Sequence, residues 1–238
     1  MSLRLSTKMR NALLDSASYS GIFNGGVLAF FSGSQPADAN TVISSSPLVY
    51  LYPKGVDPTA PFTVTSILNA GDLVNYTAHG LLDGQPVVFT GGTGAAEVVR
   101  GTIYYVFNKT ADTFQLSTAI SGGSALVITS DSAGGVTCSP AGLIMALTAS
   151  GGTIAKNSLH TWSGLGLLAG TIGFGRFQGF VNNMATTKSS LVAADTSTYA
   201  RFDFSVGTSG ADLNMSTLIV AVNAVTTVDT FDMTVPTN

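Results

Sequence analysis

The chain has 238 residues, a formal net charge of −3 and charged side chains at only 10% of its positions, against about 25% in a typical protein. This composition argues against nucleic-acid binding as a main role, because that role needs a basic patch to neutralise phosphates. It excludes an intrachain disulfide, because Cys138 is the only cysteine. A surface with few charges suits close contact with neighbouring subunits, since little charge must be desolvated.

The first predicted element is a helix near the N-terminus. Ser6 is a good N-cap, and the helix is expected to end near Ser18–Gly21. A helix of about three turns is marginal in isolation, so it must dock on something. Two interpretations are open: it covers one end of a sheet, or it inserts into a neighbouring subunit. Its docking face would carry Met9, Ala12, Leu13 and Ser16.

Two strands of an outer unit follow, at Val27–Ser32 and Pro47–Tyr52. The second has apolar residues on both sides, which predicts that it is covered on both faces. The segment Pro53–Pro61 then holds three prolines and one glycine. Proline stiffens a chain and cannot donate to a β-ladder, so this segment is predicted to be a linker.

The middle of the chain, residues 61–138, is predicted to be an inserted small β-domain. Short runs rich in Val, Ile, Thr, Tyr or Phe alternate there with Gly, Asn and Asp, which is typical of strands and tight turns. In the fifth run, Phe114 and Leu116 alternate with polar residues, which predicts one buried face. The predicted strands are Thr63–Ile67, Leu73–Thr77, Pro86–Thr90, Thr102–Asn108, Thr113–Ser117 and Ala125–Thr129.

The outer unit resumes after residue 138. Frequent glycine between Thr171 and Val181 would let a backbone or an aromatic ring come close to that strand. The predicted strands of this part are Gly142–Ala149, Thr171–Val181, Tyr199–Val206, Leu218–Val222 and Val228–Val235.

The run Tyr199–Val206 alternates most regularly. One side carries Phe202, Phe204 and Val206, and the other carries Arg201, Asp203 and Ser205. Because side chains alternate between the faces of a strand, the aromatic side is expected to be buried and the charged side to face water.

Together these elements predict an all-β protein: an antiparallel β-sandwich or jelly-roll-like domain with a short N-terminal helix and an inserted small β-domain. Residues 1–60 and 139–238 would form the discontinuous outer domain, and residues 61–138 the inserted one. The segment Met1–Ser20 lacks the apolar core of a secretory signal. No run approaches the roughly 18 apolar residues of a membrane helix. We therefore expect a protein made in the cytoplasm and no membrane partner.

Neither histidine is predicted to be catalytic. His79 follows a strand and is near Asp72, Asp83 and Ser66 in the sequence, but a general base would need such a group within hydrogen-bond reach. A structural histidine in a turn is the favoured interpretation. His160 precedes the tryptophan by two residues and is expected to pack or to form hydrogen bonds at an edge. We expect no catalytic and no cofactor-binding residues.

Metal and ligand motifs are also weak, and we expect no metal site. One Cys and two His cannot make a closed four-ligand zinc site. A calcium site on Asp and carbonyl oxygens stays open, but the Asp residues lack EF-hand spacing. With Glu97 as the one glutamate, paired carboxylates for glycan cleavage are neither indicated nor excluded. The glycine-rich stretches Gly91–Gly94 and Gly207–Gly210 lack the Lys of a phosphate loop and are assigned to hairpin turns.

Several segments of both outer parts carry a resemblance to known proteins. They are Leu5–Asp15, Ile22–Leu28, Ser32–Asp38, Thr161–Gly164, Val206–Asn214 and Phe231–Pro236. Together they resemble a group of small virion structural proteins of tailed bacteriophages, whose members usually lack the inserted module. The middle of the chain has the signature Thr77–Leu81, Asp83–Gly84, Pro86–Thr90, Tyr104–Asn108 and Asp112–Ser117. It resembles a separate β-module that recurs in phage tail and capsid-associated proteins.

The resemblance implies a non-enzymatic structural component of the virion, made in the bacterial host cytoplasm. Such a protein would dock on major capsid, neck or tail proteins by protein–protein contacts, with a capsid decoration or collar protein favoured. A homo-oligomer is expected, with a ring or trimer favoured over a dimer, because virion parts repeat by symmetry. Two alternatives stay open: a receptor-binding tail fibre or tip module whose aromatic and Asn/Asp loops hold a host surface glycan, and a virion-borne glycan hydrolase.

Overall fold

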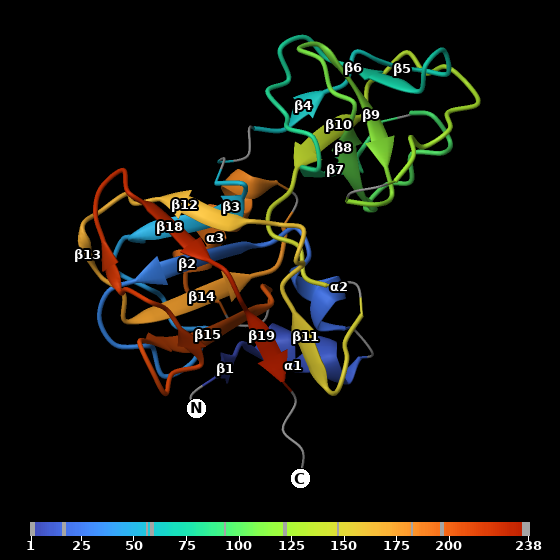
Figure 1. The fold of residues 1–238 in the computed structure, drawn as a ribbon. Coiled ribbons are helices and arrows are strands. Elements are labelled where there is room, and N and C mark those ends of the chain that lie inside the picture. Colours follow the sequence, from blue (N-terminus) through green and yellow to red (C-terminus); the bar gives the residue numbers. More distant parts are fainter. Residues whose placement is uncertain are drawn as a thin grey trace. The chain divides into compact units, whose positions relative to one another are not determined.

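A computed structural model describes residues 3–15, 18–55, 57, 60–92, 94–120, 123–146, 148–181, 183–195 and 198–234. Ser16 of the predicted helix face, parts of the predicted linker, and the predicted strand end at Val235 lie outside these residues. The chain divides into two compact units (Figure 1). The first comprises Met1–Asp57, Gly142–Val181 and Ala185–Asn238, and the second Pro58–Ala141 with Asn182–Met184.

An eight-stranded sheet forms the centre of the first unit (Figure 1). Every neighbouring pair along its main path is antiparallel, while β16 (Leu213–Asn214) pairs with β15 in parallel. The order along the path is β1 (Arg4–Leu5), β15 (Arg201–Gly207), β14 (Phe174–Gln178), β2 (Val27–Phe31), β3 (Val49–Pro53), β12 (Trp162–Leu165) and β18 (Val225–Val228).

One face of this sheet carries an aromatic core. Phe177, Phe202 and Phe204 come from β14 and β15, and Trp162 comes from β12. Two short ribbons add Ile154, Val220 and Met233 to the same cluster. They are β11 (Thr153–Ala155) with β19 (Asp232–Thr234), and β13 (Gly170–Thr171) with β17 (Ile219–Val220). The all-β fold class is confirmed.

The glycines predicted to allow close approach do so in β14 and just before it. A Cβ added at Gly175 would overlap the ring of Phe204, its cross-strand partner. A Cβ added at Gly173 would overlap the carbonyl of Gly33. Glycine is therefore required there by packing, because any side chain would displace an aromatic ring or a neighbouring backbone.

The N-terminal helix begins as predicted but is shorter. Its helix α1 spans Thr7–Leu14, with Ser6 as N-cap and Met9 buried. A separate helix, α2 (Tyr19–Phe23), begins at a second N-cap, Ser18. A third helix, α3 (Met184–Val192), was not predicted, because its sequence has no clear apolar face.

The second unit contains a seven-stranded antiparallel sheet with its own apolar core, which includes Phe114 and Leu116 as expected. The predicted strand Ala125–Thr129 is wrong, since that segment forms no ladder. The strand order is β4 (Phe62–Thr63), β10 (Thr137–Pro140), β7 (Pro86–Thr90), β8 (Ile103–Phe107), β9 (Thr113–Ser117), β6 (Leu73–Asn75) and β5 (Ser66–Leu68).

The predicted strand Gly142–Ala149 is also wrong. Leu143, Ile144 and Met145 are buried, as their composition suggests, but the described residues of this run make isolated bridges in place of a ladder, such as Leu143 with Gly26. The amide of Met145 donates to the side chain of Asn24 at 2.8 Å instead of to a strand. Here an apolar run therefore indicated burial, but it did not indicate regular pairing with another strand.

Ser6 joins α1 to the sheet, which gives a first prediction. Its buried hydroxyl donates to the carbonyl of Tyr199 at 2.9 Å and accepts from the amides of Met9 and Arg201 at 3.2 and 3.0 Å. We expect Ser6→Ala to lower the free energy of unfolding by about 1–3 kcal/mol, because buried backbone groups lose their partners. The exposed N-cap variant Ser18→Ala should cost about 0.5–1 kcal/mol. Equal losses for both variants in urea denaturation would contradict this account.

Candidate interaction surface

A buried ion pair lies on the sheet face opposite the aromatic core. Arg176 of β14 and Asp203 of β15 are cross-strand partners, and neither side chain is exposed. The Arg176 guanidinium donates from Nε and Nη2 to the two carboxylate oxygens of Asp203 at 2.6 and 2.8 Å. The expectation that Arg201 and Asp203 face water is therefore wrong. Their face is covered, because α3 packs over it.

A second cross-strand pair extends the cluster. Arg201 donates from Nε to the side-chain oxygen of Gln178, its partner in the register, at 2.7 Å. Burial, together with the nearby positive charge of Arg176, lowers the pKa of Arg201 to about 10. Burial raises the pKa of Asp203, while the hydrogen bonds from Arg176 oppose that change. The carboxylate of Asp203 is hydrogen-bonded to Arg176 and not to Arg201, so the remaining guanidinium donors need other acceptors.

The carbonyl groups of α3 and its following turn supply those acceptors. Gln178 donates from Nε2 to Thr187 O at 2.9 Å. Arg176 donates to Leu191 O at 3.2 Å, and Arg201 donates to Ser190 O and to Ala193 O. The acceptors of the two arginines, Ser190, Leu191 and Ala193, lie at the C-terminal end of the helix, where unpaired C=O groups favour cations. The helix therefore docks through its backbone as well as through apolar side chains.

The position of α3 creates a groove beside β3 and β12. Lys188 of α3 places Nζ 5.9 Å from the ring centroid of Tyr50 and 5.5 Å from that of Tyr52. The same Nζ lies 2.9 Å from both carboxylate oxygens of Asp57. Burial raises the pKa of both tyrosines, and the Asp57 charge adds to this. We call this hollow the α3 groove; its volume is about 590 Å³, and its lining includes Leu165, Leu167 and Val192.

The rim of the α3 groove is apolar and open to solvent. Leu165 and Leu167 are each 51% exposed, and Val225, the cross-strand partner of Leu165, is 67% exposed. Ser163 lies opposite Tyr52, so Leu165 projects from the same sheet face as the two tyrosines. The strands β3, β12 and β18 thus leave an apolar strip of this face uncovered.

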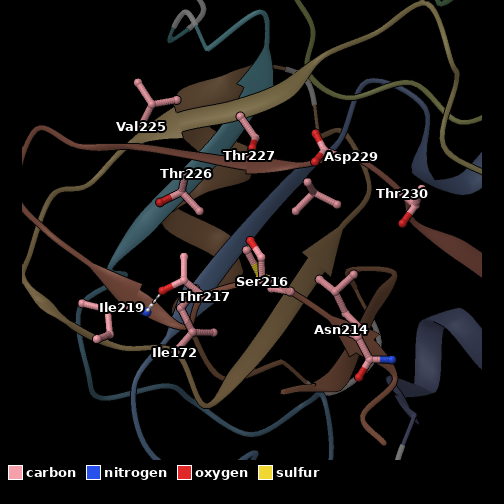
Figure 2. A pocket seen from close by; sticks show the side chains of 13 residues that line it. Ile172, Asn214, Ser216, Thr217, Ile219, Val225, Thr226, Thr227, Asp229 and Thr230 are labelled. Carbon is pink, nitrogen blue, oxygen red and sulfur yellow. Dashed lines mark hydrogen bonds between the residues drawn. The ribbon is translucent and has the colours of Figure 1, made fainter. Parts of the chain in front are cut away.

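A second hollow borders β18 and has a different chemistry. Figure 2 shows threonine and serine side chains around it, with Thr226 on one side and Ser216 and Thr217 on the other. Its volume is about 230 Å³, and Asp229 is the one charged residue that lines it. Hydroxyl groups with a single carboxylate can hydrogen-bond a polar ligand or backbone, but they lack the paired acid and base of a hydrolase.

His79 is a structural residue, as the sequence favoured. Its Nδ1 accepts from the amide of Leu81 at 3.0 Å, which leaves Nε2 to donate to the carbonyl of Thr113 at 3.3 Å. The ring also packs edge-on against Phe114 at 5.0 Å. With both ring nitrogens bonded to backbone, the histidine fixes its turn and has no free atom for proton transfer.

The acidic residues near His79 in the sequence serve other loops. Asp72 accepts from the amide of Ile128 at 2.7 Å, and Asp83 accepts from the amide of Lys109 at 3.0 Å. Ser66 accepts from the side chain of Asn75 at 2.8 Å. The structure thus gives each of these groups a role in holding loops.

The other candidates are dispersed. His160 is buried. Asp195 accepts from the amides of Thr198 and Tyr199, and Asp212 accepts from Ser205, so each closes a local turn. Within the described ranges, no group of three or more His, Cys, Asp or Glu side chains is placed to hold a metal ion. Over the same ranges, no helix is long and apolar enough to cross a membrane.

Comparison with protein-family models, curated proteins and solved structures found no match to this chain.

The buried ion pair gives a second prediction. Replacing Arg176 with Met should lower the free energy of unfolding by about 3–5 kcal/mol, because Asp203 is left as an uncompensated buried charge. The control Lys188→Met breaks an ion pair whose Asp57 side chain is 56% exposed, and it should cost less than about 1 kcal/mol. Chemical denaturation measures both variants. A loss below about 1 kcal/mol for Arg176→Met would show that the pair does not hold this face together.

Proposed function

We propose that this chain is a structural component of a tailed-bacteriophage virion, which docks on capsid, neck or tail proteins as a decoration or collar protein. The virion context rests on the sequence resemblance. The docking role rests on one observation, the solvent-exposed apolar rim of the α3 groove formed by Leu165 and Leu167. Contiguous apolar surface of this kind is typical of protein–protein contact sites.

The chemistry of the α3 groove suits a protein partner. Burying its apolar rim would contribute about 25 cal/mol for each Å² removed from water. The charge of Lys188 is already paired with Asp57 and lies over the rings of Tyr50 and Tyr52. A partner that covers the groove therefore meets a compensated charge, which lowers the desolvation cost of the contact. Tyrosines are also enriched at such interfaces, because each combines a large apolar ring with a polar tip.

The glycan-binding alternative finds less support in the second unit. Sugar recognition there would use exposed aromatic side chains in loops. Instead, all the aromatic residues of residues 61–138 are buried or half-buried: Phe62, Tyr76, Phe89, Tyr104, Tyr105, Phe107 and Phe114. Several serve the core of that unit, such as Phe62, which stacks on Tyr76 at 4.2 Å.

Charge insertion into the groove tests the docking role. We expect Leu165→Asp and Leu167→Asp each to reduce the copy number of this protein in purified phage particles by at least about tenfold, which corresponds to a loss of about 1.4 kcal/mol of binding free energy. The matched control is Leu159→Asp, since Leu159 is 57% exposed and does not line the groove. Quantitative mass spectrometry of particles gives the copy number.

Two results would contradict the proposal. The first is wild-type protein that is absent from purified particles. The second is full incorporation of both groove variants with unchanged stability. Binding of the wild-type protein to host polysaccharide, without incorporation, would instead favour the receptor-binding alternative.

A further inference from the structure

The outer edge of β18 is weakly protected. β18 is the last strand of the eight-stranded sheet and, among the described strands, pairs with β12 alone. Sheet edges are usually protected from other strands by Lys or Pro, by a bulge or by a covering segment. Val225–Val228 contains no charge and no proline, and its register with β12 is continuous. Residues 221–225, 227, 229 and 230 are all exposed.

The hydrogen bonds to β12 fix the direction of each backbone group in β18. The amide of Gly166 donates to the carbonyl of Ala224 at 2.9 Å. On the other side of β12, the amide of Lys54 donates to the carbonyl of Thr161 at 2.8 Å. In an antiparallel ladder, residues bonded to one neighbour alternate with residues bonded to the other. Even-numbered residues of β12 thus bond to β18, and odd-numbered residues bond to β3.

Because of this alternation, two residues of β18 direct their backbone N–H and C=O groups away from β12. Thr226 and Val228 bond to β12, as Ala224 does, so the N–H and C=O groups of Val225 and Thr227 point away from it. Val228 packs in the core, and Thr226 therefore faces the same side, into the hydroxyl-lined hollow (Figure 2). Val225 and Thr227 face the opposite side and are exposed.

We infer that two copies of this chain pair through β18, antiparallel about a two-fold axis that passes between the two Thr226 residues. In this register Val225 of each copy lies opposite Thr227 of the other. Both are outward-directed residues, so each pair exchanges two backbone hydrogen bonds. Residues opposite each other also share a face of the joined sheet, which a two-fold axis perpendicular to the sheet requires.

The chemistry of the edge favours a second copy over an unrelated strand. The outward donors and acceptors are complementary to themselves in this register. No like charges meet within the paired strands, since Val225–Val228 carries no charge. The hollow of about 230 Å³ gives room for the second copy's Thr226 side chain. Pairing would also cover Val225, which is 67% exposed. The contact is small, so the expected dimer is weak, with a micromolar dissociation constant.

A single cysteine tests the register directly. Thr226→Cys would place two cysteines opposite each other in a non-hydrogen-bonded pair, whose Cα atoms lie about 4.5 Å apart and within disulfide reach. We expect this variant of the full chain to form a disulfide-linked dimer under mild oxidation. Thr227→Cys should not, because the two residues would be about 8 Å apart on the diagonal. The wild-type protein is the negative control and should form no disulfide-linked dimer, since its Cys138 is fully buried. Cross-linking at 227 and not at 226 would overturn the inference.

Two substitutions at one position test the backbone bonds. Thr227→Pro removes an outward N–H without breaking a bond to β12, and Thr227→Val keeps that N–H. Sedimentation velocity should show a reversible dimer for wild type and Thr227→Val, and a dissociation constant at least about tenfold higher for Thr227→Pro. If Thr227→Pro fails to fold, the cysteine experiment decides. A wild-type protein that stays monomeric throughout the micromolar range would overturn the inference. Such a result would leave the proposed virion role intact, because that role does not depend on the β18 pairing.

Discussion

The buried pair of Arg176 and Asp203 is the constraint on which the working surface of the first unit depends. Charges at a strand's centre are costly unless every donor and acceptor is satisfied. Here the donors of the Arg176 guanidinium find acceptors on two other elements. A second strand supplies the carboxylate, and the end of a helix supplies a carbonyl oxygen. Gln178 and Arg201 repeat the arrangement one pair further along the ladder. The polar cluster thus determines where α3 sits, which its own apolar content would specify poorly.

The placement of α3 divides the sheet face into a covered and an open part. Over β14 and β15 the helix buries charged side chains, and over β3 and β12 it leaves the α3 groove with its exposed leucines. The opposite face is filled by an aromatic core, and a hollow of about 540 Å³ opens there beside β15, with Leu5, Phe202 and Phe204 in its lining. Exposed apolar residues and a weakly protected edge then gather around β12 and β18. In a chain with few charges, such surface is available for contact with other proteins.

Alternation along strands predicted much of this fold. It identified the exact span of β7 and β9, and it assigned Phe202 and Phe204 to the core. It failed for Arg201 and Asp203. A polar strand face shows that its side chains need hydrogen-bond partners, and these partners can be protein groups instead of water. The helix that covers Arg201 and Asp203, α3, is rich in Thr and Ser and has no apolar stripe from which a helix could be predicted. The strand β18 was missed because four residues with two threonines resemble a loop. The groove combines residues distant in sequence, so no local pattern could reveal it.

Native-state hydrogen exchange of the α3 amides tests most directly whether the polar cluster holds the helix as part of the core. If it does, the amides of Thr187–Leu191 should exchange with the same opening free energy as the central amides of β14 and β15, as one cooperative unit. The carbonyls of this segment accept hydrogen bonds from Arg176, Gln178 and Arg201, and local opening would break all of them. Fast exchange of α3 beside a fully protected sheet would contradict the account, because the α3 groove would then lack a fixed wall.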